Sequence, residues 1–361
     1  MERRETRELL VGGVKVGGGA PISVQSMTST RTTDVVATAA QIEKLAEAGC
    51  EIVRVAVPDA AAAAALPEIL AGSPIPVIAD IHFDHRLALR ALDAGVAGLR
   101  LNPGNIGSQG RVREVVEAAK GRGVSIRIGV NAGSLEKDIM AGIDHGDPEA
   151  LPGAMVKSAM RHIGILEGMD FTDIKVSLKA SSIWPTVKAY RLLAEEVDYP
   201  FHIGITEAGT KFGGTVKSAV GIGLLLAEGL GDTLRVSLSG DPVEEVRVGW
   251  EILKSLGLRQ RGVSVVACPT CGRIKIDAAA LAITLEQRLG GLTEPVTVAV
   301  MGCVVNGPGE ATEADVGITG GDGVALLYVG GVVVRKVPEA ELADAVEQEV
   351  LKVVARRRVT C

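Results

Sequence analysis

Short aliphatic segments alternate with amphipathic stretches from residue 22 to about residue 238. Each aliphatic segment has the length of a buried strand, and the stretch after it has the hydrophobic period of a helix. Several of these stretches end at a glycine, which is typical of a helix C-cap. The pattern predicts strands at 21–27, 51–57, 75–81, 97–102, 124–130, 172–178, 200–206 and 233–239.

Eight successive strand–helix units predict an α/β fold of the TIM (β/α)8 barrel type. A doubly wound open sheet is the alternative, because it uses the same alternation. A helix at about 242–256 closes this region, and the polar segment 257–262 is expected to be a linker. We therefore expect a barrel domain at 1–257 and a smaller α/β domain at 258–361, which ends in an amphipathic helix from about Glu339 to Arg358.

Composition restricts the environment and the partners of the chain. Hydrophobic residues make up 47% of it but aromatic residues only 2%, so the core must consist of Val, Ile, Leu and Ala. The net charge of −6 supplies no overall basic field for nucleic acid, and no apolar run reaches the roughly 18 residues that a membrane span needs. The N-terminus lacks the features of a secretory signal. We expect a cytoplasmic protein with neither nucleic acid nor membrane as partner.

Several expected barrel strands carry a cation within an otherwise aliphatic segment. Both faces of such strands are normally buried, and an unpaired buried cation is costly, so an anionic group must meet these side chains. A carboxylate such as Asp80 or Glu207 is one possible partner. A strand end that faces solvent is a second explanation. A diphosphate ligand at the barrel mouth is the third, because guanidinium groups match phosphate oxygens. The cations are Arg54, Arg100, Arg127, Lys175 and Arg235.

Polar residues gather directly after the same strands. The carboxyl ends of barrel strands form the mouth at which barrel active sites are built. Together with nearby glycines, which let backbone amides approach an anion, these residues predict a substrate-binding ring. They are His82, Asn102, Asn131, Ser134, Ser177, Lys179, His202, Thr206 and Glu207.

Three cysteines of the second domain suggest a metal centre. Cys268 and Cys271 form a CPTC turn, which taken alone is typical of a structural zinc knuckle. All five histidines lie in the barrel region, so the second domain adds only Cys303 and the terminal Cys361. Three thiolates with a weaker fourth ligand favour an iron–sulfur cluster with one labile iron. Glu310, in the same loop as Cys303, is the preferred fourth ligand.

Eight motifs, in order across nearly the whole chain, closely resemble those of the 4-hydroxy-3-methylbut-2-enyl diphosphate synthase family. The resemblance implies a TIM barrel joined to a [4Fe–4S] domain, in the two-domain bacterial arrangement. It also implies reductive ring opening and dehydroxylation of 2-C-methyl-D-erythritol 2,4-cyclodiphosphate in the non-mevalonate isoprenoid pathway, with electrons from flavodoxin or ferredoxin. The motifs are VGGGAPISVQSMTST, DIHFD, LRLNPGN, GVNAGSL, IKVSLKAS, HIGITEAG, CPTCGRIKID and MGCVVNGPGEA.

The resemblance also implies individual roles. Cys268, Cys271 and Cys303 would be the thiolate ligands of the cluster, and Glu310 would occupy the fourth iron until substrate displaces it. Glu207 would be the acid nearest the reacting carbon–oxygen bond. Substrate contacts are implied for Arg54, Arg100, Arg127, Asn131, Lys175, Thr206, Arg235, Ser237 and Asn306.

Two other interpretations remain open from the residues alone. One is a barrel lyase or aldolase that uses Lys175 or Lys179 as a Schiff-base nucleophile and carries a structural zinc domain. The other is a zinc-dependent binding module with an inert barrel. Metal analysis separates them, because only the reductase contains iron and sulfide.

Barrel geometry predicts a head-to-tail homodimer. The last strand runs toward the active-site mouth and the helix at about 242–256 returns from it, so the chain leaves the barrel at the opposite face. That helix spans roughly 20 Å, and a linker of about six residues reaches about that distance only when fully extended. The cluster domain must therefore either swing far by another route or serve the barrel of a second chain. A head-to-tail homodimer with two-fold symmetry satisfies both partners at once, and the family resemblance implies the same arrangement.

Overall fold

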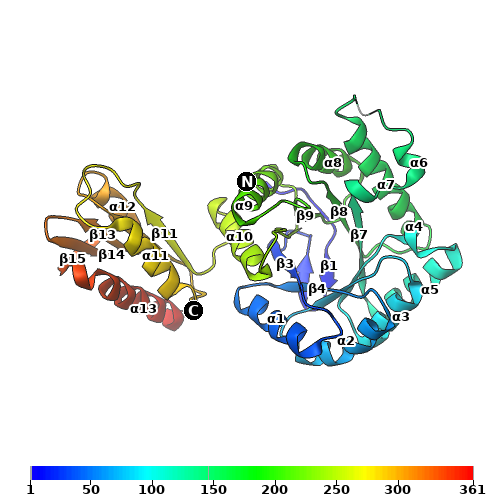
Figure 1. Ribbon diagram of the computed structural model, residues 1–361, viewed down its shortest axis with the longest axis horizontal. Coiled ribbons are helices and arrows are strands. Elements are labelled where there is room, and N and C mark those ends of the chain that lie inside the picture. Colours follow the sequence, from blue (N-terminus) through cyan, green and yellow to red (C-terminus); the bar gives the residue numbers. More distant parts are fainter. Residues whose placement is uncertain (1, 145, 361) are drawn as a thin grey trace. The chain divides into compact units, whose positions relative to one another are not determined.

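The computed structural model describes residues 2–144 and 146–360 of the chain. They form two compact units, with the division between Arg259 and Gln260. Figure 1 shows the helices and strands of both units, coloured along the sequence. None of the helices within the described residues is long and apolar enough to span a membrane.

Eight parallel strands form the sheet of the first unit, in the order β8-β7-β6-β5-β4-β3-β10-β9. A bridge between Val176 and Phe201 joins the two ends, so the sheet closes into the expected TIM barrel rather than an open doubly wound sheet. β9 is shorter than expected and ends at Ile203, just before Gly204, where a Cβ atom would lie 2.2 Å from the Arg235 carbonyl oxygen. The strands are β3 (Ser23–Met27), β4 (Ile52–Ala56), β5 (Val77–Asp80), β6 (Gly98–Arg100), β7 (Ser125–Asn131), β8 (Ile174–Lys179), β9 (His202–Ile203) and β10 (Thr233–Leu234).

Helices surround this barrel on its outer side (Figure 1). Asp34 and Asp59 cap the first two helices, because each side chain accepts a hydrogen bond from a backbone amide three residues later. Gly95 and Gly123 end α3 and α5 in the left-handed conformation, as their sequence positions predict. The helices are α1 (Val35–Glu47), α2 (Ala60–Gly72), α3 (His85–Ala94), α4 (Pro103–Ile106), α5 (Gln109–Arg122), α6 (Lys137–Met140), α7 (Ala150–Glu167), α8 (Ile183–Glu196), α9 (Lys211–Ala227) and α10 (Pro242–Ser255).

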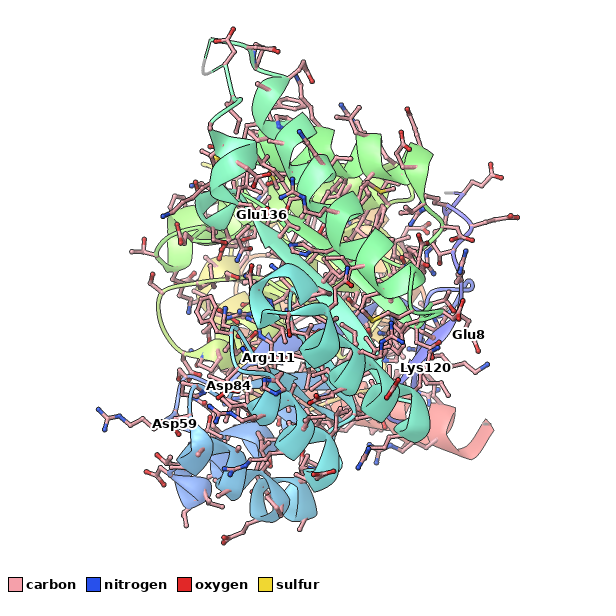
Figure 2. The ribbon with its side chains drawn as sticks, turned by 90° about the vertical axis from the view of Figure 1, so that its right-hand side faces the viewer. Glu8, Asp59, Asp84, Arg111, Lys120 and Glu136 are labelled. Atoms are coloured by element: carbon pink, nitrogen blue, oxygen red, sulfur yellow. The ribbon has the colours of Figure 1, made fainter. Side chains whose placement is uncertain are left out.

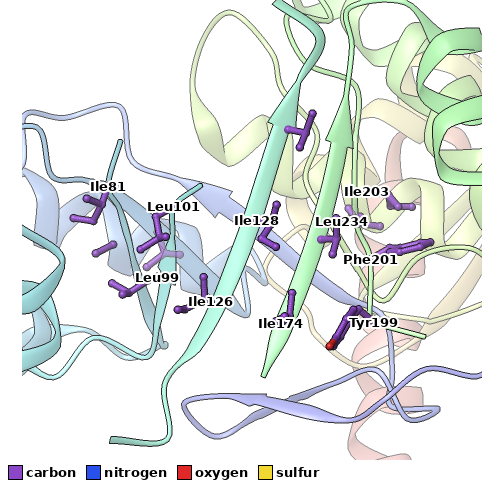
Figure 3. Close-up of a cluster of buried hydrophobic side chains, with 14 of the residues drawn as sticks. Ile81, Leu99, Leu101, Ile126, Ile128, Ile174, Tyr199, Phe201, Ile203 and Leu234 are labelled. Atoms are coloured by element: carbon purple, nitrogen blue, oxygen red, sulfur yellow. The ribbon is translucent and has the colours of Figure 1, made fainter. Parts of the chain in front are cut away.

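The main core lies between the strands and the helices. Its side chains are almost all aliphatic, such as Ile126, Ile174 and Leu234, with Phe201 among the few rings (Figure 3). Polar side chains cover the opposite, outer face of the helices. Arg111 of α5, for example, is exposed on the wall that Figure 2 shows. Burial of one face of each helix against the barrel therefore holds this unit together.

A β-hairpin, which the sequence pattern did not predict, precedes the barrel. Leu9, Val11 and Val16 of this hairpin pack against Ile52 and Ile78, near the amino ends of β4 and β5. The hairpin thereby closes the barrel interior at the end opposite the expected active site. Its strands are β1 (Leu9–Val11) and β2 (Val14–Val16), which pair antiparallel.

The second unit is a five-stranded mixed sheet in the order β11-β12-β13-β14-β15. β11, β12 and β13 run parallel, whereas β14 and β15 pair antiparallel. The terminal helix, expected from about Glu339, begins at Leu342 after a short 3-10 helix. The elements are β11 (Val263–Ala267), α11 (Ala278–Leu289), β12 (Val296–Met301), α12 (Gly307–Glu313), β13 (Val316–Gly320), β14 (Val324–Val329), β15 (Val332–Pro338), η2 (Glu339–Glu341) and α13 (Leu342–Thr360).

Candidate functional site

A cavity of about 220 Å³ opens at the carboxyl ends of the barrel strands. Its wall is polar and mostly cationic, unlike the aliphatic side chains that commonly fill a barrel interior. Ten of the residues expected around a ligand lie in this wall, and Asp80, expected only as a partner of the strand cations, completes it. The lining consists of Arg54, Asp80, His82, Arg100, Arg127, Asn131, Ser177, Lys179, Thr206, Arg235 and Ser237.

Asp80 holds two of the arginines in place. Its carboxylate lies 3.5 Å from Arg100 Nη1 and 3.8 Å from Arg54 Nε. Burial alone would raise the pKa of Asp80, but Arg54, a hydrogen bond from His82 and Arg100 together bring it below its ordinary value. Asp80 therefore stays ionised, as the carboxylate interpretation of the strand cations predicts for these two residues. One carboxylate against two guanidinium groups still leaves a net positive wall.

A second carboxylate, Glu245 at the start of α10, binds the arginine of the last strand. Arg235 Nε lies 3.2 Å from Glu245 Oε2, and Arg235 Nη2 lies 3.3 Å from Oε1. The Leu238 amide and the Ser26 hydroxyl also donate to this carboxylate, which is buried. Sequence reasoning missed Glu245, because a Glu in the first turn of a helix is ordinary and carries no signal of its own.

Arg127 projects into the cavity with most of its donors unused. Its Nη1 donates to the Ser177 hydroxyl at 3.1 Å, but Nε and Nη2 have no partner among the described residues. Burial first, and then the guanidinium groups of Arg54 and Arg100, lower the pKa of Arg127. Buried polar groups are normally hydrogen-bonded, so these free donors are suited to an anionic ligand.

The two lysines of β8 occupy different places. Lys179, at the end of the strand, lines the cavity, and its Nζ lies 3.3 Å from His202 Nε2. Lys175, for which a substrate contact was expected, is fully buried and does not belong to the lining. Lys175, Ser177 and Lys179 alternate along β8 and therefore point to the same face of the strand. Lys175 lies two residues nearer the barrel bottom than Ser177.

Thr206 and Glu207 follow β9 in a tight turn. Thr206 lines the cavity, whereas Glu207 is exposed and outside the lining. The backbone of Glu207 has a φ of 51°, a left-handed conformation that residues other than glycine rarely adopt. Such strain tends to occur at functional sites, where the surrounding structure maintains it.

The cysteines of the second unit lie on neighbouring loops. Cys268 directly follows β11 and Cys303 follows β12, and these two strands pair in parallel, so both loops leave the same edge of the sheet. The Gly302 amide donates to Cys268 Sγ at 3.1 Å, while Cys271 is exposed. Amide hydrogen bonds to cysteine sulfur are a feature of iron–sulfur sites, and three soft thiolates suit such a cluster.

The other two expected residues of this unit lie where the Cys303 loop enters α12. Asn306 precedes the helix and Glu310 lies in its first turn, and both side chains are exposed. Within the described residues, no three Cys, His, Asp or Glu side chains approach closely enough to hold a metal ion. The donors thus lie on adjacent loops without forming a closed metal site. Cys361 lies outside the described residues.

Comparison with known proteins gives matches along nearly the whole chain. The GcpE TIM-barrel domain matches residues 6–250, and the GcpE protein C-terminal domain matches residues 264–352. The 4-hydroxy-3-methylbut-2-en-1-yl diphosphate synthase (flavodoxin) of Geobacter sulfurreducens is 62% identical over 98% of this chain and 99% of its own length. A protein of the same name from Symbiobacterium thermophilum is 57% identical, over 99% of this chain and 97% of its own.

Proposed function

The chain belongs to the GcpE family of 4-hydroxy-3-methylbut-2-en-1-yl diphosphate synthases, and from this premise we propose how its residues perform the reaction. The enzyme is an oxidoreductase that converts 2-C-methyl-D-erythritol 2,4-cyclodiphosphate to 4-hydroxy-3-methylbut-2-enyl diphosphate in the non-mevalonate isoprenoid pathway. The substrate binds in the barrel cavity with its diphosphate against the arginines. The free Nε and Nη2 donors of Arg127 are the observation that carries this proposal.

The cations hold the diphosphate rather than react with it. Arg54, Arg100 and Arg235 supply positive charge and oriented hydrogen-bond donors. Each is kept in place by Asp80 or Glu245. Fixed guanidinium groups in a partly buried wall bind phosphate more strongly than mobile surface groups, because little ordering remains to be done on binding. The remaining contacts come from Arg127, Asn131, Lys179, Thr206 and Ser237 in the cavity, and from Asn306 of the second unit.

The family uses a [4Fe–4S] cluster, and Cys268, Cys271 and Cys303 are its proposed thiolate ligands. Glu310 is the proposed ligand of the fourth iron in the resting enzyme. The thiolate loops leave one sheet edge, and the Gly302 amide already donates to Cys268 Sγ, which supports this assignment. When bound, the cluster supplies electrons one at a time and a Lewis-acidic iron for the departing oxygen. Glu207 is the proposed proton source for that oxygen.

Flavodoxin is the proposed electron donor, with ferredoxin as the alternative carrier. The name flavodoxin is part of the names of both relatives described above, which supports this choice. A cytoplasmic location follows from the same proposal, because a reducing compartment keeps thiols available for the cluster.

The enzyme is proposed to act as a head-to-tail homodimer in which one chain's cluster unit serves its partner's barrel. Large apolar side chains are exposed on segments that connect barrel strands to the helices after them: Phe83 is 73% exposed, Trp184 59% and Phe212 84%. Phe83 lies in the loop after β5, and Trp184 and Phe212 lie in the first turns of α8 and α9. In the cluster unit, Val304 and Val305, next to Cys303, are about equally exposed. Exposed apolar groups at both functional ends support burial between two chains.

An anaerobic assay tests the proposed function. The purified, iron-loaded enzyme with reduced flavodoxin should convert the cyclic diphosphate to the linear product. Arg127→Met should keep the cluster colour but weaken substrate binding by several kcal/mol, because a buried charge-assisted contact is lost. Arg111→Met, on the exposed face of α5, is the matched control and should behave as wild type. A colourless protein that contains zinc and forms a Schiff base at Lys179 would contradict the proposal.

A further inference from the structure

A layer of buried polar side chains lies directly beneath the substrate cavity. Lys175 of β8 is 1% exposed, Gln25 of β3 1% and His202 of β9 0%. Lys175 and Ser177 lie on the same face of β8, so the lysine begins about 7 Å below the cavity wall. Barrel interiors at this depth are usually filled with branched aliphatic side chains. The polar layer therefore needs an explanation other than packing.

Lys175 has no partner for its amine in this layer. Its Nζ makes no hydrogen bond to any described residue, and both amide atoms of Gln25 are equally without partners. The neighbour of Lys175 across the sheet is Arg127, a second cation. Burial first, and then Arg127, lower the pKa of Lys175 to about 7, against the opposing effect of Asp232. An unpaired buried ammonium is far more costly than a neutral amine.

Charged and polar neighbours nevertheless couple Lys175 electrostatically to the cavity. Arg127 lines the cavity and is also the register partner of Lys175 on the neighbouring strand, so it is close to both. On the other side, His202 contacts Lys179 through Nε2, and Thr233 Oγ1 lies 2.8 Å from its Nδ1. Burial, Lys179 and Arg127 lower the pKa of His202, so the ring is neutral, accepts from Lys179 and donates to Thr233. The charged groups that act on Lys175 or on this histidine are Arg54, Arg127, Lys179 and Asp232.

We propose that Lys175 is an uncharged amine in the empty barrel and accepts a proton from solvent when the diphosphate occupies the cavity. The inference rests on the proposed function, because it requires an anionic ligand there. One negative charge at about 7 Å, in a medium of effective dielectric constant about 20, favours the ammonium form by a factor of roughly 50. The proton adds to the amine lone pair, and no other bond changes. The positive charge that Lys175 gains thus offsets part of the negative charge of the bound ligand.

Calorimetric titration of the substrate into the full-length, cluster-loaded enzyme without reductant measures this proton uptake. The titration is run at about pH 8, which lies between the lowered pKa of Lys175 and the ordinary pKa of lysine. It is repeated in two buffers with different ionisation enthalpies. Each phosphorus of the cyclic diphosphate carries one strongly acidic hydroxyl, so the ligand itself exchanges no proton. Wild type should take up about one more proton per bound ligand than Lys175→Met. Lys44→Met, on the exposed surface of α1, should match wild type.

The pH dependence of affinity gives the same answer by another route. From about pH 7.5 to about pH 8.5, the substrate affinity of wild type should decrease by up to about tenfold more than the affinity of Lys175→Met does. Equal proton uptake and equal slopes in the two proteins would overturn the inference while leaving the proposed function intact. A wild type that does not bind the cyclic diphosphate at all would contradict the proposed function, and this inference with it.

Stability of the ligand-free protein provides a control that does not depend on binding. The folded state holds fewer protons than the unfolded state between about pH 7 and the ordinary lysine pKa, because the pKa of Lys175 is lowered on folding. Wild type should therefore gain stability relative to Lys175→Met as the pH rises through this range. At about pH 7 the methionine variant, which removes an unpaired polar group, should unfold at the higher temperature. A pH-independent loss of stability in the variant would contradict a neutral, unpartnered Lys175.

Discussion

Glu207 illustrates at the scale of one residue how a site can be maintained against local preference. Of the described residues other than glycine, only Glu207 and Asp170 have a positive φ. A left-handed conformation costs such a residue roughly 1 to 2 kcal/mol. The turn TEAG therefore retains a glutamate at a position that glycine would occupy more easily, and a role for its carboxyl group explains this choice.

Glu207→Gly should raise the free energy of unfolding by about 0.5 to 1 kcal/mol, because relief of the strained φ exceeds the added flexibility of the unfolded chain. The control Glu207→Gln removes the charge but keeps the strain, so its stability should stay close to that of wild type. Both variants should lose the ability to form product. Denaturant unfolding and the anaerobic assay measure the two effects. A glycine variant no more stable than the glutamine variant would show that the backbone here is not strained.

At the scale of elements, the parallel pair β11 and β12 is what brings the thiols together. Parallel neighbours end at the same sheet edge, so residues that follow them become neighbours although more than thirty positions separate them in the chain. The hydrogen bond from Gly302 to Cys268 Sγ is the visible result. The proposed cluster site thus depends on strand pairing in the second unit as well as on the CPTC turn.

Each of the single variants Cys268→Ser, Cys271→Ser and Cys303→Ser should lose the cluster, because hard oxygen ligands substitute poorly for soft thiolates. Cys50→Ala is the control, since Cys50 is buried in the barrel core and donates its thiol hydrogen to the Ile52 carbonyl. Iron and sulfide content per chain, measured anaerobically after reconstitution, reports the result. If the Cys50 variant loses iron and the Cys303 variant keeps it, the ligand assignment is wrong.

At the scale of the whole molecule, the proposed substrate site and the proposed cluster ligands lie in different units of one chain. The cations of the barrel unit come from strands between Arg54 and Arg235, and the thiols come from residues beyond 260. The proposed reaction requires both, so the proposed active assembly brings a barrel mouth and a cysteine loop together. The proposed head-to-tail dimer achieves this twice with one symmetric interface.

Co-expression of Arg127→Met with Cys303→Ser tests this assembly. If each site combines two chains, a mixed dimer contains one site with both defects and one with neither, so activity should reappear although each variant alone is inactive. Assay of purified mixed dimers, selected by two different affinity tags, measures the recovery. Two copies of Arg127→Met form the control and should stay inactive. Mixed dimers that form but show no activity would exclude the cross-chain arrangement.

Much of this architecture could be predicted from the sequence. Eight aliphatic segments with amphipathic stretches between them favour a closed parallel barrel over an open doubly wound sheet, because eight such units are the number that closes a TIM barrel. Arg54, Arg100, Arg127 and Arg235 stand out in such strands because a cation there violates the usual pattern, and the structure places all four in the cavity wall. Cysteine count and histidine distribution favoured a cluster over zinc for a similar compositional reason.

The tertiary structure alone decided which partner each charge has. Glu245, from a helix late in the barrel, binds Arg235, and Asp80 is shared by Arg54 and Arg100. The sequence predicts both Lys175 and Lys179 near a ligand, yet Lys179 lines the cavity and Lys175 lies unpartnered beneath it. Periodicity specifies the face on which a side chain lies, but its depth along the barrel depends on strand register and tilt. Register and tilt arise from the packing of all eight strands together, which no local stretch of sequence encodes.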